Sequence, residues 1–196
     1  MRKVILQEFV SLDGLASGAN GRVDFVPTAM QGDQSFGRDQ LKLIDSIDTI
    51  LLGRVTYQMF SQYWPNVTRP DEKAFADKVN ATPKIVFSKK LDRAPWGTWD
   101  EAQVVNNSAA RELAKLTRQA GKDMLIWGSL SVAQSLMNQA LIDEYQLVVC
   151  PVVLGSGRPL FLDNVDKFQL KLLEATPFDR GAVLLKYRPP HARSAD

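Results

Sequence analysis

The chain has 196 residues, of which 45% are hydrophobic, and this is enough to bury the core of one domain. Its 24 lysines and arginines stand against 22 aspartates and glutamates, a net charge of +2 that gives no reason to expect nucleic-acid binding. No apolar stretch approaches the length of a membrane span, and the start, MRKVILQEFV, is too short and interrupted for a signal peptide. We therefore expect a cytoplasmic protein that binds no membrane, with one domain over residues 1–190 and a polar tail over 191–196.

The chain contains one cysteine, Cys150, and one histidine, His191. An internal disulfide is therefore impossible, and zinc sites or catalytic pairs built on histidine and cysteine lack their members. His191 lies in the polar segment PPHARSAD and is interpreted as a solvated tail residue, while Cys150 is interpreted as a small core residue. We expect no metal site, and chemistry that relies on a carboxylate, a hydroxyl or a bound cofactor.

The first half of the chain alternates segments of strand and helix character. Residues 3–14 are rich in strand formers, a Gly/Asn-rich loop follows over 16–25, and a polar stretch continues to about Gly37. The spacing of Leu41, Ile44 and Ile47 then predicts a short amphipathic helix. Further along we expect buried strands at 49–53 and 84–88, a helix at 55–61, and another that starts at Asp71 and ends before Thr82-Pro83.

The second half continues the alternation and then changes character. A short strand at 103–106 precedes a helix that Ser108 can cap, and a strand at 123–128 precedes a helix with Ser131 and Gln134 as its capping box. A long strand is expected at 144–155, followed by strands at 168–178 and 182–189 that form an antiparallel hairpin. The predicted class is α/β, with a mostly parallel central sheet flanked by helices and an antiparallel C-terminal hairpin.

Residues suited to phosphate follow three of the predicted strands. A glycine lets the backbone approach an anion, and the first amides of the next helix have no partner within it and lie at the positive end of its dipole. Two such strand ends match a pyrophosphate, and a third with a hydroxyl and two lysines matches a further phosphate. The residues are Gly53, Arg54, Val55 and Thr56 after the first strand, Ser88, Lys89 and Lys90 after the second, and Gly128, Ser129, Leu130 and Ser131 after the third.

Each of these motifs also has a plainer interpretation. Gly-Ser after a strand is often only a turn, Ser-Lys-Lys is often a solvated strand exit, and Arg54 could form a surface salt bridge. The common position of the three motifs at strand ends favours the phosphate interpretation. A fixed, forked cation such as Arg54 is also a usual means of accepting the 2′-phosphate of NADP.

The motifs SLDGLAS, TILLGRVTY and IVFSKKL, with the block LIWGSLSVAQSLMNQALIDEYQLVVCPVVLGSGRPLF, resemble the dihydrofolate reductase-like superfamily. Within it the chain is most similar to the reductase domain of the bifunctional riboflavin-biosynthesis deaminase-reductase, over nearly its whole length. The resemblance implies a dihydrofolate reductase-like fold, NADPH as cofactor, hydride transfer to a pterin-, pyrimidine- or imine-like heterocycle, and a homodimer formed through the C-terminal strands. The alternative is a non-catalytic NADP(H)-binding or sensing module that retains the cofactor cradle.

The resemblance also assigns residues by position. The three strand-end motifs would hold the phosphates, with Arg54 favoured for the 2′-phosphate, and the backbone at Phe9 and Ala16 would frame the nicotinamide amide. Residues 17–25 would act as a lid. Asp13 could assist protonation, although it could equally cap the turn before Gly14. Candidates for contact with the substrate are three aromatic residues, which could also be plain core, and one arginine: Phe25, Tyr57, Trp64 and Arg158.

The chain departs from the family pattern on one helix. Dihydrofolate reductases carry a carboxylate on the helix that precedes the Gly-Arg motif, facing the pterin. The equivalent position here is Gly37, with Asp33 and Asp39 nearby but out of register. We therefore do not expect folate reduction. The deaminase half of the riboflavin enzyme has no counterpart in this sequence.

Overall fold

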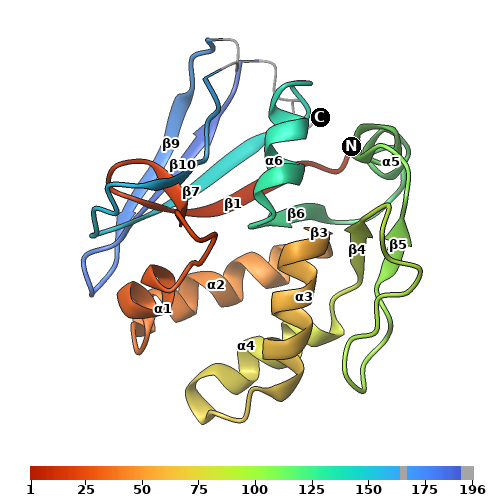
Figure 1. Cartoon of the computed structure of the whole chain (residues 1–196), viewed down its shortest axis with the longest axis horizontal. Helices are drawn as coiled ribbons and strands as arrows, with labels where there is room; N and C mark the ends of the chain where they lie inside the picture. The colour runs from red at the N-terminus through yellow and green to blue at the C-terminus, as the bar shows by residue number, and fades with distance from the viewer. Residues whose placement is uncertain (164–166, 191–196) are drawn as a thin grey trace.

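The computed structural model describes residues 1–163 and 167–190 (Figure 1). The strands are β1 (Val4–Ser11), β2 (Leu15–Gly18), β3 (Ile47–Gly53), β4 (Lys84–Phe87), β5 (Gln103–Val105), β6 (Asp123–Trp127), β7 (Glu144–Cys150), β8 (Gly157–Pro159), β9 (Lys171–Pro177) and β10 (Val183–Arg188). The helices are α1 (Phe25–Met30), α2 (Gln34–Ser46), α3 (Arg54–Tyr63), α4 (Pro70–Ala81), α5 (Ala109–Leu116) and α6 (Leu130–Met137), with a 3₁₀ turn at Trp64–Asn66. The tail 191–196, with His191, lies outside the described residues.

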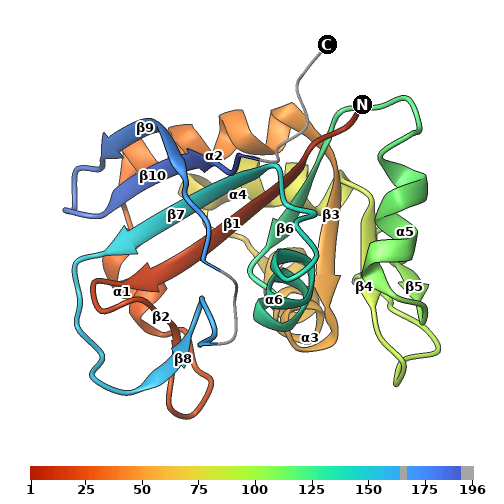
Figure 2. The same ribbon diagram turned by 90° about the horizontal axis from the view of Figure 1, so that it is seen from above.

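One eight-stranded sheet forms the centre of the molecule, in the order β5-β4-β3-β6-β1-β7-β10-β9 (Figure 2). Pairing is parallel from β5 to β7 and antiparallel where β10 meets β7 and β9. The predicted α/β class, with a mostly parallel sheet and an antiparallel C-terminal hairpin, is confirmed. No helix among residues 1–163 and 167–190 is long and apolar enough to cross a membrane.

The helices cover the sheet in two layers (Figure 1). On one face, α5 and α6 bury apolar side chains against alternate residues of β1, such as Leu6 and Val10. On the other face, α2 and α4 pack against the intervening residues, such as Ile5. Because the side chains of a strand point alternately to the two faces, β1 is a central strand with apolar residues on both sides. The buried Cys150 lies in a further apolar cluster with α1, as expected of a core residue.

Two segments that we predicted to be irregular contain regular structure. The expected loop at 16–25 includes most of β2, which forms a separate antiparallel ribbon with β8. The pairing joins Leu15 to Pro159, so its partner is too far along the chain for a local pattern to reveal. The expected polar stretch up to Gly37 contains α1 and the start of α2. Burial of Phe25 and Met30 stabilises α1, whose six residues FVPTAM include a proline and are too few for helical spacing to be read from the sequence.

Two predicted boundaries are also wrong. Ser131 does not cap α6, because Ser129 is the N-cap and adopts a left-handed conformation with φ of 63°. The helix therefore begins at Leu130, one residue before the expected capping box. The long strand predicted at 144–155 ends at Cys150, since Pro151 follows and cannot donate to a ladder.

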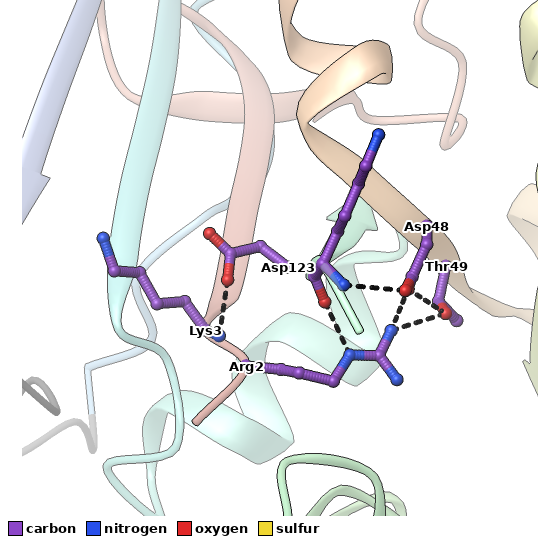
Figure 3. A network of polar contacts seen from close by, with 6 residues as sticks. Arg2, Lys3, Asp48, Thr49 and Asp123 are labelled. Carbon is purple, nitrogen blue, oxygen red and sulfur yellow. Dashed lines mark hydrogen bonds and ion pairs between the residues drawn. The ribbon is translucent and has the colours of Figure 1, made fainter. Parts of the chain in front are cut away.

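A network of charges joins three strands at their amino ends (Figure 3). Arg2 is only 7% exposed. Its Nε donates to the Lys122 carbonyl over 2.6 Å and its Nη2 to the Thr49 hydroxyl over 2.8 Å, and its guanidinium pairs with Asp48. Asp48 also accepts the Lys122 amide over 2.8 Å, and the Asp123 carboxylate accepts the Lys3 amide over 2.8 Å. These contacts fix β1, β3 and β6 relative to one another at the edge opposite their carboxyl ends.

The network predicts unequal effects of removing its two charges. Asp48→Ala leaves the buried Arg2 guanidinium without its counter-ion, and we expect a loss of about 2–4 kcal/mol in the free energy of unfolding. Arg2→Met should cost less, because Asp48 has a side chain 36% exposed that water can solvate and still accepts the Lys122 amide. Chemical denaturation of both variants measures this difference. If the two variants lose the same free energy of unfolding, the difference in burial between Arg2 and Asp48 does not determine the cost of breaking the pair.

Candidate functional site

The three motifs proposed for phosphate lie at one edge of the sheet. β4, β3 and β6 are neighbours and run parallel, so their carboxyl ends lie at the same edge. Gly53 pairs with Phe87 of β4, and Leu51 pairs with Ile126 of β6. The structure therefore brings together the segments that begin at Gly53, Ser88 and Gly128, as the strand-end pattern predicted.

A single hydrogen bond joins the start of α3 to the start of α6. The Gly53 amide donates to the Ser129 hydroxyl over 2.8 Å, and both groups are buried. A Cβ at Gly53 would lie 3.2 Å from Cγ2 of Val132, so any larger residue would require the Val132 side chain to move. A Cβ at Gly128 would lie 3.6 Å from Cγ2 of Thr56, which shows how closely α3 approaches the turn before α6. Gly128 and Ser129 both have positive φ, 62° and 63°, an arrangement that costs a non-glycine residue about 1 kcal/mol or more.

Both helix N-termini at this edge lack a side-chain cap. Gly53 has no side chain to offer, and the Ser129 hydroxyl is turned to the Gly53 amide rather than to its own helix. The first-turn amides, including those of Val55, Thr56 and Ser131, are therefore left for an external acceptor. Two helix dipoles with uncapped ends at the same place favour an anion with two negative groups, such as a diphosphate.

Cations lie toward the outer side of this edge. Arg54 opens α3, is half-buried, and donates from Nη1 to the Gln58 side chain over 3.0 Å. After β4, the Ser88 hydroxyl accepts the Lys90 amide over 3.1 Å, and Lys89 and Lys90 are exposed. The site therefore has uncapped amides at its centre and positively charged side chains toward the side of β4.

Beside the two helix N-termini, the last residues of β1 have no strand partner among the described residues on the side of β6. We call this unpaired stretch the gap. Pairing of β1 with β6 ends at Gln7 and Trp127, while pairing of β1 with β7 continues to Ser11 and Cys150. The Gln7 carbonyl accepts the Gly128 amide over 3.0 Å, so by the alternation of a strand the amide and carbonyl of Phe9 also point toward the gap. Ala16, the other backbone position proposed to frame a nicotinamide, is buried in β2.

Glu8 is a buried acid at this gap, and our sequence analysis did not include it. The residue is 6% exposed, and its Oε2 has no hydrogen-bond partner. Its Oε1 lies 4.0 Å from the point that a Cβ at Gly128 would occupy. Burial raises the pKa of Glu8 to about 8, and a hydrogen bond from the Phe9 amide opposes only part of that rise. The signal in the sequence is a carboxylate at a position that strand alternation assigns to the core, between Leu6 and Val10.

On the opposite face of β1, three buried glutamines lie between β1, β7 and α2. Gln7 Nε2 donates to Gln146 Oε1 over 3.4 Å, while Gln7 Oε1 and Gln40 Nε2 have no partner. Gln40 stands one helical turn from Phe36 and one from Ile44 on α2. Phe36 contacts Phe9, and Ile44 shares a cluster with Ile5. Gln40 lies between Phe36 and Ile44 on α2, so it faces Gln7, which lies between Ile5 and Phe9 on β1. Unpaired buried amide groups are costly, and Gln40 stands about one helical turn from Gly37, the position equivalent to the carboxylate of dihydrofolate reductases.

Asp13 binds a loop rather than the turn beside it. Its carboxylate accepts the amides of Leu154 over 3.1 Å and Gly155 over 2.8 Å. Hydrogen bonds lower the pKa of Asp13 to about 2. The bond with the Ser11 side chain has the largest effect, and the bonds from the Leu154 and Gly155 amides add to it. The carboxylate is therefore ionised at neutral pH and fixes the segment between β7 and β8.

The four residues proposed to contact substrate do not come together. Tyr57 lies in the core below α3 and donates from its hydroxyl to the Pro95 carbonyl over 2.8 Å. Trp64 stacks on Trp127 with ring centroids 5.2 Å apart, in the same cluster. Phe25 belongs to a different cluster, and Arg158 is exposed on β8.

Comparison with known proteins places this edge in a family context. The profile of the RibD C-terminal domain matches residues 2–184. The chain belongs to the RibD C-terminal domain family. This is the branch that the sequence motifs indicated, the reductase domain of the riboflavin deaminase-reductase.

Similar sequences and structures support the assignment of this chain to the RibD C-terminal domain family. The uncharacterized protein YyaP of Bacillus subtilis (strain 168) is 35% identical over 187 residues, which cover 95% of this chain and 94% of YyaP. A pyrimidine reductase-like protein from Corynebacterium diphtheriae superposes with a TM-score of 0.67 at 18% identity, covering 98% of this chain and 93% of that one. Dihydrofolate reductase from Enterococcus faecalis, in complex with NADP(H), has a TM-score of 0.60 at 11% identity and 96% coverage of each chain. These two structures show that the chain has a dihydrofolate reductase-like fold.

The unpaired amide of Gln40 predicts a gain in stability when it is removed. Gln40→Leu replaces a buried donor without a partner by an apolar side chain of similar size, and we expect the free energy of unfolding to rise by about 1 kcal/mol. The melting temperature should then rise by about 2–4 °C. Gln139→Leu, at an exposed position after α6, is the matched control and should leave the melting temperature unchanged. A lower melting temperature for Gln40→Leu would mean that this amide has a partner that stabilises the fold.

Proposed function

We propose that the chain is an NADPH-dependent reductase that transfers hydride to a small heterocycle of the pterin, pyrimidine or imine type. The observation that carries the proposal is the pair of uncapped helix N-termini beside the gap between β1 and β6. An uncapped pair of this kind suits a diphosphate, and beyond Gln7 the edge of β1 that faces β6 has no strand partner in the described part of the chain. The NADP(H) bound to the Enterococcus faecalis relative, which shares the fold, supports the same assignment.

In this proposal the strand ends divide the cofactor between them. The amides of Arg54 to Thr56 and of Ser129 to Ser131 hold the diphosphate, while Gly53 and Gly128, whose own amides are already bonded within the chain, let the backbone approach it. Arg54, with Ser88, Lys89 and Lys90, holds the 2′-phosphate and the adenosine end. The backbone of Phe9 and Ala16 orients the nicotinamide amide in the gap. When bound, the cofactor supplies the hydride, and the chain orients it and limits access of water.

The acceptor would lie on the α2 side of the gap, where the three buried glutamines offer amide groups. Amide edges form paired hydrogen bonds with lactam groups of heterocycles, which agrees with the pyrimidine reductase-like description of the Corynebacterium diphtheriae relative. The β2–β8 ribbon and residues 17–25 would cover the site, with Phe25, which belongs to the same apolar cluster as Phe9, as the aromatic contact. Asp13 would relay a proton through solvent rather than donate its own, because its low pKa keeps it ionised.

A second candidate function is a module that binds NADP(H) without catalysis. The position of the family carboxylate on α2 is taken by Gly37, and Gln40, the buried polar residue about one turn further along that helix, is an amide. Such a module would keep the cradle and lack a group that delivers a proton to the acceptor. The two functions differ in whether bound NADPH is consumed.

Cofactor binding tests the cradle. We expect the chain to bind NADPH with a much lower Kd than NADH, because Arg54 and the lysines after β4 would face the 2′-phosphate. Quenching of protein fluorescence measures both Kd values. Arg54→Ala should weaken NADPH binding by about tenfold and leave NADH binding nearly unchanged, since a charged hydrogen bond contributes about 1.5–3 kcal/mol. Arg118→Ala, an exposed arginine after α5, is the control. Equal affinity for the two cofactors, or no binding, contradicts the proposal.

Turnover then separates the two candidate functions. For a reductase of this branch, we expect NADPH absorbance to fall with ribosylaminopyrimidine substrates and to stay constant with dihydrofolate. Tight NADPH binding without consumption with either class of acceptor would favour the binding module.

We also propose a homodimer formed through the C-terminal strands. β9 is at the edge of the sheet, and its Leu172 and Leu173 are 50% and 46% exposed. Successive residues of a strand point to opposite faces, so the edge is apolar on both sides.

Light scattering tests this proposal. We expect a dimer for the natural chain and a monomer for Leu173→Glu, because a charge at an apolar strand contact is costly to bury. Met59→Glu, at an exposed apolar position on α3, should remain a dimer. A natural chain that is monomeric at all concentrations rules the proposal out.

A further inference from the structure

Glu8 occupies a position that the fold reserves for apolar side chains. It lies on β1 between Leu6 and Val10, which are part of the core under α5 and α6. Its side chain takes part in no ion pair that the described residues provide, and its Oε2 has no hydrogen-bond partner. A buried carboxyl without an ion pair lowers the stability of the fold, and such groups are typical of functional sites.

The carboxyl lies against the groups proposed to hold the cofactor. Its Oε1 is near Gly128 and, through that residue, near Thr56 at the start of α3. Phe9, whose backbone we assign to the nicotinamide amide, is the next residue along β1. Glu8 thus lies beside the turn into α6 and next to the backbone that would orient the nicotinamide.

The surroundings of Glu8 supply no charge to balance it. Its partner on β7 is Leu147, and the residues of β2, of the turn into α6 and of the first turn of α3 that approach it are uncharged apart from Arg54. Arg54 is directed to Gln58. Burial is therefore the dominant influence, and it raises the pKa of Glu8 to about 8. The acid is mostly protonated at neutral pH.

We propose that Glu8 makes cofactor binding depend on a proton: the dinucleotide binds to the chain in which Glu8 is a neutral acid. The inference rests on the proposed function. A neutral carboxyl can donate a hydrogen bond to a ligand oxygen through its unpartnered Oε2. A carboxylate at the same position would place a buried negative charge close to the diphosphate, and the two would repel. Glu8 is in this view a positioning residue that also sets the pH range of binding.

The test is the Kd of NADPH from about pH 7, where the 2′-phosphate is already ionised, to about pH 9. Affinity should fall as pH rises, because only the protonated acid binds, and the Kd should increase by about tenfold over this range. Glu8→Gln is neutral at every pH and similar in shape, so its Kd should stay nearly constant. Glu112→Gln, on α5 and away from the site, should keep the pH dependence of the natural chain.

Calorimetry gives a second measurement that needs no variant. Titration of NADPH into the natural chain in two buffers of different ionisation enthalpy counts the protons taken up on binding. We expect uptake of about 0.9 proton per cofactor at about pH 9 and of about 0.1 at about pH 7. The measurement remains decisive if Glu8→Gln fails to fold.

The outcomes separate this inference from the proposed function. NADPH binding whose Kd is constant with pH, or a Glu8→Gln variant with the slope of the natural chain, overturns the role of Glu8 and leaves the reductase proposal standing. Binding without proton uptake at about pH 9 has the same meaning. Absence of NADPH binding at every pH overturns both.

Discussion

The hydrogen bond from the Gly53 amide to the Ser129 hydroxyl is the contact on which the functional edge of the sheet depends. It joins the end of β3 to the turn that enters α6, and it uses the one hydroxyl that could have capped that helix. Gly53 and Gly128 leave room for the approach. The uncapped amides, the position of Thr56 and the burial of Glu8 are all consequences of bringing α3 and α6 this close.

The two edges of the parallel sheet have opposite electrostatic character. At the amino edge, Arg2, Asp48 and Asp123 are paired with one another or with backbone groups, and the strands are fixed there. At the carboxyl edge, amides lack caps, Ser129 is in a strained conformation and Glu8 has an oxygen without a partner. Unsatisfied groups cost stability, so their concentration at one edge is the pattern expected of a site that a ligand completes.

The sequence predicts those features of the fold that depend on residue patterns within a single segment of the chain. Alternating strands and helices predicted the parallel sheet, and this topology alone places Gly53, Ser88 and Gly128 at one edge. Three features could not be reached in this way. The β2–β8 ribbon depends on a pairing between distant segments, the partners of Asp13 belong to a loop after β7, and the importance of Glu8 and Gln40 depends on which faces the helices cover. Those faces are decided by tertiary packing, which residue spacing does not contain.

The central place of β1 in the sheet has a consequence for biosynthesis. In the sheet, β1 pairs only with β6 and β7, and contacts such as that of Lys3 with Asp123 join residues 120 positions apart. A nascent chain shorter than this carries an apolar strand whose neighbours have not been translated. Pauses in translation before β6 should therefore leave β1 dependent on chaperones, and the domain should close only when its second half has emerged.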